Sequence, residues 1–319
     1  MKTDPPPRAT PGPFAAAAPA MAPLAMHLPE AWRGRYDASW RLMRADRPIG
    51  WLLLLWPTLV ALWLAAEGMP SLHLLLVFAG GVWLTRAAGC VINDYADRWL
   101  DGRVRRTKAR PLVAGELSGR FALGLFAGLM GVAFVLVLTT NAKTIALSGV
   151  ALALAAAYPY MKRHTYLPQV WLGLAFSWGI PMAFTATRDA WPPQEAWLLL
   201  CANLLWTTAY DTWYAMVDRE DDRRAGAKST ALLFGDLDVP VIAALFVLAG
   251  VAMGLLGHRL EFGLVYWLGL AAAGVFVAQQ FAQGRSRHPD DCFAAFLANN
   301  RVGAAVFAGV ALQYFVARG

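Results

Sequence analysis

Charged residues are scarce in this sequence: only 15% of its 319 positions are Asp, Glu, Lys or Arg, whereas 58% are hydrophobic. Long polar stretches are missing too, because nine apolar runs follow one another with short gaps. This spacing leaves little room for a separate soluble domain, and the mean hydropathy of +0.44 is typical of membrane proteins. The runs lie at roughly 49–66, 72–92, 119–138, 144–160, 168–187, 195–217, 239–257, 262–281 and 296–316.

Each apolar run has the length of a membrane-spanning helix and is about twice too long for a barrel strand. We therefore predict an all-α, polytopic membrane protein with nine transmembrane helices. The glycines at 124, 128 and 131 have a spacing that predicts close helix packing within this bundle.

Cysteine is also rare, and the three cysteines, Cys90, Cys201 and Cys292, do not have the spacing of metal ligands. Isolated histidines such as His73 have no metal partner at ligand spacing either. This pattern argues against a zinc-type centre and predicts three reduced, structural cysteines.

Residues 1–40 lack helical or strand periodicity and are rich in proline and alanine. We predict a disordered tail over 1–40, followed by one intramembrane domain over 41–319. A cleaved signal peptide would need an apolar core without interior prolines, which this segment does not have. A transit peptide remains an alternative, although the segment has few arginines and serines.

Positive charges concentrate before the first apolar run and in the even-numbered connections. Only four lie on the opposite side: Lys143, Arg188, Arg259 and Arg318. This asymmetry predicts a cytoplasmic N-terminus and an outer C-terminus. The formal net charge of +7 is then mainly a topology signal, and nucleic-acid binding explains it poorly.

An acidic stretch, Asn93, Asp94, Asp97 and Asp101, directly follows the second run. Spacings of three and four residues place the three aspartates on one side of a helix that continues past the membrane surface. Carboxylates this close repel one another unless a cation lies among them, and their oxygen atoms suit Mg²⁺. The alternative is a solvated helix end without a function.

A second acidic stretch closes the sixth run, where Asp218 and Asp222 repeat the spacing of Asp97 and Asp101. Asp211 lies two turns earlier on much the same face. A basic loop follows each stretch, and 218 − 97 = 121 residues separate their leading acids, which suggests a weak internal repeat of four helices. Both stretches emerge on the same side of the membrane, so they can face each other across a cavity.

Two carboxylate clusters beside many arginines and lysines indicate a particular kind of ligand. The clusters can hold Mg²⁺ that bridges to a diphosphate, while the basic side chains bind the remaining oxygen atoms. In a membrane this predicts a prenyl diphosphate. A divalent-cation or anion transporter is an alternative, but it would spread its polar residues along a path through several helices.

Arg86 lies seven residues before Asn93, about two turns deeper in the membrane. Burying a guanidinium there costs at least a few kcal/mol, so such a residue usually faces an interior cavity and has a partner. Arg86 either binds a carboxylate of a second substrate, or it extends to the interface or pairs with Asp94 or Asp211.

Three stretches, RADRPIGWLLLLWPT (44–58), NDYADRWLDGRVRRTKARPL (93–112) and YDTWYAMVDREDDRRAGAKSTALLFG (210–235), resemble the intramembrane UbiA-type aromatic prenyltransferases. The resemblance covers nearly everything after the first forty residues. It implies nine helices around a central cavity and two aspartate motifs that bind Mg²⁺. The implied metal residues are Asn93, Asp97, Asp101, Asp218 and Asp222, and the implied diphosphate-binding residues are Lys162 and Arg163. Lys228, in the basic loop after the second stretch, is our own additional candidate for binding the diphosphate. Arg86 matches the arginine that holds the aromatic carboxylate.

The implied reaction is transfer of a polyprenyl group from polyprenyl diphosphate to 4-hydroxybenzoate, at the ring carbon meta to its carboxylate, in ubiquinone biosynthesis. Homogentisate, a naphthoate, a chlorophyllide or haem remain alternative acceptors. Asp94, Asp211 or the released diphosphate could remove the ring proton. The implied location is the bacterial inner membrane, with the metal motifs on the cytoplasmic side.

Overall fold

The computed structural model describes residues 27–101, 107 and 109–317, and these residues form helices joined by short turns, without a strand. The first half contains α1 (Glu30–Leu42), α2 (Ile49–Ala66), α3 (Leu72–Asp101), α4 (Gly119–Leu138), α5 (Ala142–His164), α6 (Pro168–Ser177) and α7 (Gly179–Arg188). The second contains α8 (Gln194–Val217), α9 (Arg219–Ala225), α10 (Thr230–Phe234), η2 (Gly235–Leu237), α11 (Asp238–Arg259), α12 (Leu264–Gly284) and α13 (Pro289–Ala317).

Eight helical segments of the described chain are long and apolar enough to cross a membrane. They are α2, α3, α4, α5, the α6–α7 pair, the α10–α11 segment, α12 and α13. The sequence predicted one helix over 168–187. The structure instead has two helices, α6 and α7, which are separated at Trp178, directly before Gly179 and close to Pro181. These lengths and compositions confirm the prediction of an all-α membrane protein.

The remaining predicted span, 195–217, coincides with α8, which is not among the eight. Its buried residues include Asn203, Thr207, Thr208 and Thr212, and these polar side chains lower its hydropathy. Because α8 packs against α6, α11 and α13, it lies inside the bundle and presents little surface to lipid. The count of nine transmembrane helices and the internal repeat stay predictions.

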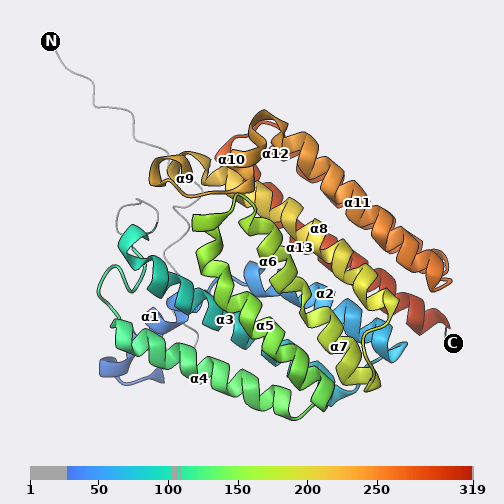
Figure 1. Cartoon of the computed structure of the whole chain (residues 1–319), viewed down its shortest axis with the longest axis horizontal. Helices are drawn as coiled ribbons and strands as arrows, with labels where there is room; N and C mark the ends of the chain where they lie inside the picture. The colour runs from blue at the N-terminus through green and yellow to red at the C-terminus, as the bar shows by residue number, and fades with distance from the viewer. Residues whose placement is uncertain (1–26, 102–106, 108, 318–319) are drawn as a thin grey trace.

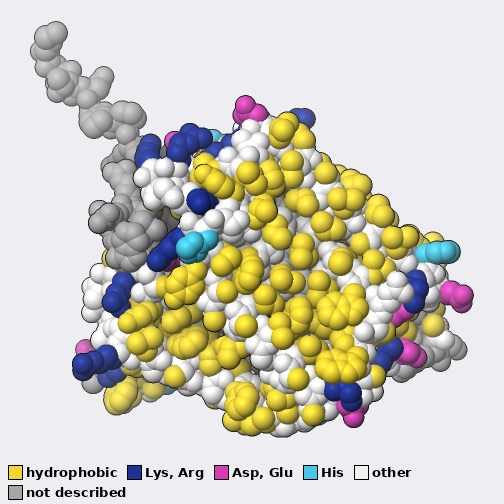
Figure 2. Space-filling view, in the orientation of Figure 1, with side chains coloured by type: hydrophobic (Ala, Val, Ile, Leu, Met, Phe, Trp, Pro, Cys, Tyr) yellow, Lys and Arg dark blue, Asp and Glu magenta, His cyan; other side chains and the backbone are white. Residues whose placement is uncertain are grey.

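The outer surface of the helical bundle is divided into an apolar band and charged margins. Figure 1 shows the long helices arranged side by side, with α9 and α10 at one end. In the same orientation, Figure 2 shows hydrophobic side chains across the middle and Lys, Arg, Asp and Glu side chains gathered near the edges. This distribution fits a protein whose apolar band lies in the bilayer and whose margins reach water.

Close helix packing occurs between α12 and α13. An added Cβ atom at Gly269 would lie only 2.5 Å from the Cα atom of Gly309, so the two backbones approach where both side chains are absent. The packing that we predicted for Gly124, Gly128 and Gly131 is wrong. These residues are exposed on α4, and an added Cβ atom would meet nothing within 4 Å.

Helix α1 corrects the predicted boundary at residue 40, because it begins at Glu30. Its Ala38 and Leu42 are fully buried against α3 and α4. Arg41 of α1 forms ion pairs with Asp37 and with Glu116 of the turn before α4. The short apolar face of α1 therefore docks on the bundle, while residues 1–26 lie outside the described part of the chain.

Candidate active site

The two acidic stretches end helices at the same end of the bundle. Helix α3 ends at Asp101, and Asp218 stands between α8 and α9. Figure 1 shows the C-terminal end of α3 and the short helix α9 at this end. The backbone N–H of Asp222 donates to the carbonyl of Asp218 at 2.8 Å, so these two residues lie one helical turn apart.

The acidic side chains differ in their surroundings. Asp97, Asp218 and Asp222 are half-buried, and the side chain of Asp101 lies outside the described part. Within that part, no three His, Cys, Asp or Glu side chains gather closely enough to hold a metal ion. Mg²⁺ commonly takes one or two carboxylates together with the phosphates of a substrate, so carboxylate pairs are suitable donors for it.

Asp94 lies in an ion-pair cluster rather than in an open acidic row. Its side chain is only 4% exposed, and both carboxylate oxygens accept hydrogen bonds from Arg44 Nη2 at 3.1 Å. Arg110 Nη1 donates to Asp94 Oδ1 at 3.0 Å. Arg44 has a backbone φ of +56°, an uncommon conformation for a residue with a side chain. Asp94 thus links α3 to the turn after α1 and to the loop before α4, two partners that sequence reasoning missed.

Arg86 lies deeper along α3, where we predicted it. Its Nη1 atom is 3.0 Å from Cys90 Sγ, and its Nε atom is buried without a hydrogen-bond partner among the described residues. Arg86 is within electrostatic range of Tyr158 on α5 and of Asp211 on α8. Three helices therefore converge around this guanidinium, which retains capacity to donate to an anion.

A small cavity adjoins Arg86 and brings in two further arginines. Its volume is about 20 Å³, and its lining includes Arg44, Arg47, Gly50 and Trp83. Gly50 leaves the space that the guanidinium occupies, because a Cβ atom there would lie 2.7 Å from Arg86 Nε. Arg44 and Arg47 belong to the RADRPIG stretch, which was the available sequence signal for their role.

The predicted diphosphate-binding residues lie at the C-terminal end of α5 and on the loop after α9, two segments that contact each other. Lys228 is half-buried, its Nζ atom donates to the carbonyl of His164 at 3.4 Å, and it lies 5.3 Å from the centre of the Tyr166 ring. This contact joins the loop after α9 to the connection between α5 and α6. Arg163, at the end of α5, is exposed, and the side chain of Lys162 lies outside the described part.

An apolar chamber of about 490 Å³ lies between α2, α8, α11, α12 and α13. Its lining is almost entirely hydrophobic and includes Trp56, Phe246 and Phe281. Asn203 and Trp206 bring α8 to the chamber, and Asp211 follows Trp206 on the same helix about 7 Å further along its axis. Helix α8 therefore borders both the chamber and the surroundings of Arg86, with Asn203 and Trp206 on one face and Asp211 on another.

A buried arginine near polar helix ends, in a bundle that also contains an apolar chamber, suits a membrane enzyme that acts on a lipid-like anion. The chain belongs to the UbiA prenyltransferase family, whose sequence model matches residues 54–301. It is 59% identical over 281 residues to the 4-hydroxybenzoate octaprenyltransferase of Xanthomonas euvesicatoria pv. vesicatoria (strain 85-10), covering 88% of this chain and 93% of that relative.

Solved structures share the fold. A UbiA homolog from Aeropyrum pernix K1 in its apo form aligns with a TM-score of 0.73 and 25% identity, over 82% of this chain and 97% of that chain. A UbiA homolog from Archaeoglobus fulgidus bound to GPP and Mg²⁺ aligns with a TM-score of 0.63 and 18% identity, over 86% and 99%. The predicted resemblance and fold class are therefore confirmed.

Proposed function

We propose that this protein transfers a polyprenyl group from polyprenyl diphosphate to the ring carbon of 4-hydroxybenzoate meta to its carboxylate, a step of ubiquinone biosynthesis. One observation of the structure supports it above others. Arg86, a guanidinium with a buried, unpartnered Nε, lies in the membrane-spanning part beside a chamber-lining helix. A carboxylate on an apolar aromatic ring complements such a group. The 59% identical relative, a 4-hydroxybenzoate octaprenyltransferase, supports the same acceptor.

The diphosphate head would bind at the acidic and basic end of the bundle. Lys228 and Arg163, with Lys162, would donate to its oxygen atoms. Bound Mg²⁺ would neutralise the charge of the diphosphate and so make the diphosphate a better leaving group. Its proposed protein ligands are Asn93, Asp97, Asp101, Asp218 and Asp222. Charge grows on the diphosphate oxygens as the allylic C–O bond breaks, so preorganised cationic side chains lower this barrier most effectively.

The acceptor would be oriented by Arg86. Its guanidinium would bind the carboxylate of 4-hydroxybenzoate and thereby turn one ring carbon, ortho to the phenol oxygen, toward the allylic carbon. Arg44 and Arg47 line the adjoining cavity and add positive charge there. Fixing both partners in this way would set which carbon atom is prenylated.

The apolar chamber suits the prenyl tail. Its volume of about 490 Å³ falls within the range of small-molecule sites, and its lining offers almost no hydrogen-bonding groups. A prenyl tail bound there would extend among the helices. Its chain length would be that of the prenyl diphosphate available in the cell. The same apolar walls would keep water from the allyl cation, which water would otherwise capture.

The ring proton must leave after the new C–C bond forms. Asp211 is our proposed acceptor, because it lies within electrostatic range of Arg86 and therefore near the acceptor ring. Released diphosphate is the alternative. Asp94, which the sequence also suggested, already accepts hydrogen bonds from Arg44 and Arg110, so its carboxylate oxygens are held in that cluster.

We place the reaction at the cytoplasmic side of the bacterial inner membrane. The predominance of lysine and arginine in the even-numbered connections supports this orientation. In it, both acidic helix ends would face the cytoplasm.

Product analysis tests the function directly. Purified protein would be incubated with Mg²⁺, one prenyl diphosphate and, separately, 4-hydroxybenzoate, homogentisate and a naphthoate. We expect prenylated product from 4-hydroxybenzoate and none without the metal. Faster turnover of another aromatic acid would show that this acid, and not 4-hydroxybenzoate, is the acceptor. Ion transport without any prenylated product would contradict the proposed enzymatic activity.

A further inference from the structure

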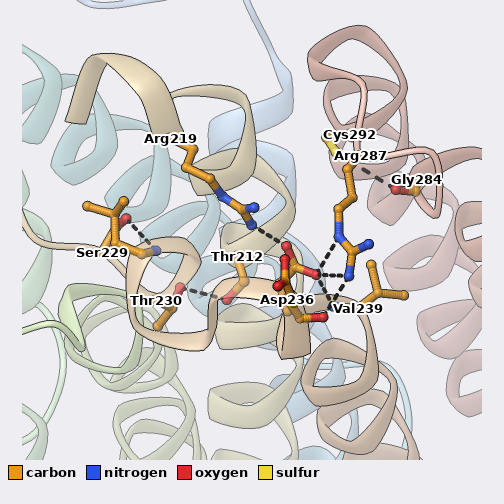
Figure 3. Close-up of polar contacts among 11 residues, drawn as sticks. Thr212, Arg219, Ser229, Thr230, Asp236, Val239, Gly284, Arg287 and Cys292 are labelled. Atoms are coloured by element: carbon orange, nitrogen blue, oxygen red, sulfur yellow. Dashed lines mark hydrogen bonds and ion pairs between the residues drawn. The ribbon is translucent and has the colours of Figure 1, made fainter. Parts of the chain in front are cut away.

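Asp238, the first residue of α11, is a fully buried carboxylate with two arginine partners. Arg219 Nη2 donates to its Oδ2 atom, and Arg287 Nε donates to its Oδ1 atom at 2.9 Å. Arg287 also donates to the carbonyl of Asp236 at 2.7 Å. Figure 3 shows the guanidinium groups of Arg219 and Arg287 pointing from two sides toward the region of Asp236 and Val239, the residues near the start of α11. A buried carboxylate with two cationic partners is held in one place.

Arg219 connects this cluster to the second acidic stretch. It directly follows Asp218 and begins α9, whose seven residues include Asp222. The side chain of Arg219 is 19% exposed, so it lies largely inside the protein beside Asp238. A helix this short is not stable by itself, and its placement depends on such tertiary contacts.

The far end of the same segment is anchored separately. Ser229 caps α10, and the backbone N–H of Thr230 donates to Gln169 of α6 at 3.0 Å. The hydroxyl groups of Thr230 and Thr212 are 2.8 Å apart. These contacts hold the segment after α9, whereas the contact between Arg219 and Asp238 holds its start.

Helix α11 has a second ion pair at its other end, where it is joined to the start of α8. There Arg259 Nε lies 2.5 Å from Glu195 Oε1, and the two side chains are 49% and 19% exposed. The pair at Asp238 links α9 to α11, the pair at Arg259 links α8 to α11, and only Arg219 adjoins an acidic stretch. The pair at the opposite end is therefore a natural control for a purely structural link.

We infer that Asp238 is a positioning residue for the second aspartate motif. By holding Arg219, it fixes the start of α9 and so sets where the Asp218 and Asp222 carboxylates lie. This inference rests on the proposed function, in which those carboxylates bind Mg²⁺ with the diphosphate. Residues that orient metal ligands typically change metal affinity about 10- to 100-fold when they are replaced.

The test compares Asp238→Asn with Glu195→Gln. Binding of Mg²⁺ in the presence of inorganic pyrophosphate would be measured by calorimetry on purified protein, and KM and kcat would be measured with the full substrates. We expect Asp238→Asn to weaken Mg²⁺ binding about 10- to 100-fold, whereas Glu195→Gln keeps the affinity of the unsubstituted protein. Equal Mg²⁺ affinities in the two variants would overturn the inference.

A double-mutant cycle with Arg219→Gln tests the route of the effect. If Asp238 acts through Arg219, the losses of Mg²⁺ affinity in the single variants will not add in the double variant. Full additivity would contradict this route. If Asp238→Asn does not fold, the Mg²⁺ affinity of Arg219→Gln becomes the test. An affinity equal to that of the unsubstituted protein would then overturn the inference.

The binding measurement separates this inference from the proposed function. It needs no aromatic acceptor, so an enzyme that prenylates another ring would still show the loss of Mg²⁺ affinity. If the unsubstituted protein bound no Mg²⁺ with pyrophosphate, the metal role in the proposed function would fail first.

Discussion

Gly50 of α2 and Arg86 of α3 fit together so closely that a Cβ atom at position 50 would lie 2.7 Å from Arg86 Nε and 2.8 Å from Arg86 Nη2. The glycine therefore defines where the guanidinium can lie. Both residues line the same small cavity, so a change at one position is transmitted to the site through the other.

Replacing Gly50 with alanine should displace the Arg86 guanidinium. We expect kcat/KM for 4-hydroxybenzoate to fall about 10- to 100-fold, because misplacing a substrate-orienting group by about 1 Å has effects of this size. The matched control is Gly81→Ala on α3, where an added Cβ atom meets nothing within 4 Å. Steady-state kinetics in detergent would check both, and equal kinetics in the two variants would contradict the steric argument.

Arg86→Ala should weaken binding of the aromatic acid specifically. Loss of a hydrogen bond to a charged group costs roughly 1.5–3 kcal/mol, which corresponds to about a 10- to 150-fold increase in KM for 4-hydroxybenzoate. The KM for prenyl diphosphate should stay nearly constant. If both KM values rose equally, Arg86 would have a structural role instead.

Asp222→Asn should reduce turnover by about 10²–10³, since it removes a carboxylate that would hold the Mg²⁺ stabilising the departing diphosphate. Glu220→Gln is a matched control two residues away, because the exposed Glu220 forms a surface ion pair with Arg223 and such pairs contribute about 0–1 kcal/mol. Prenylation would be measured over a Mg²⁺ titration. Near-normal activity of Asp222→Asn at every concentration would rule out the metal role.

Asp94→Asn should destabilise the fold more than it alters substrate binding. The change leaves Arg44 and Arg110 beside a buried neutral group, and breaking a buried ion pair typically costs about 3–5 kcal/mol. We expect a clearly lower melting temperature in detergent. A fully stable Asp94→Asn variant without turnover would instead support Asp94 as the group that accepts the ring proton.

Gly269→Val should destabilise the contact between α12 and α13. The new side chain would collide with the backbone at Gly309, and overpacking of this kind typically costs about 1–3 kcal/mol. Gly124→Val on the outer face of α4 is the control, and its melting temperature should change little because that position is open. Similar melting temperatures would show that the two helices separate easily.

Some candidate site residues stand out in the sequence because local chemistry limits the environments open to them. An arginine within an apolar run, or carboxylates spaced by three and four residues at a helix end, has few stable environments in a membrane protein. Arg86, Asp97, Asp218 and Asp222 were predicted in this way, and their roles in the site stay predictions. Asp238 and Gly50 gave no comparable signal, since a lone aspartate after a loop and a glycine at the start of a run have many ordinary roles.

The sequence alone determined the helical membrane fold, because runs of apolar residues with the length of a bilayer can satisfy their backbone only as helices. It also determined the chemical character of the acidic helix ends. Only the tertiary structure decided that Asp94 pairs with Arg44 and Arg110, and that Gly124 faces outward while Gly269 packs. These outcomes depend on which helix faces pack against each other. The packing is decided by the total free energy of many contacts between residues far apart in the sequence, and no local pattern of residues encodes it.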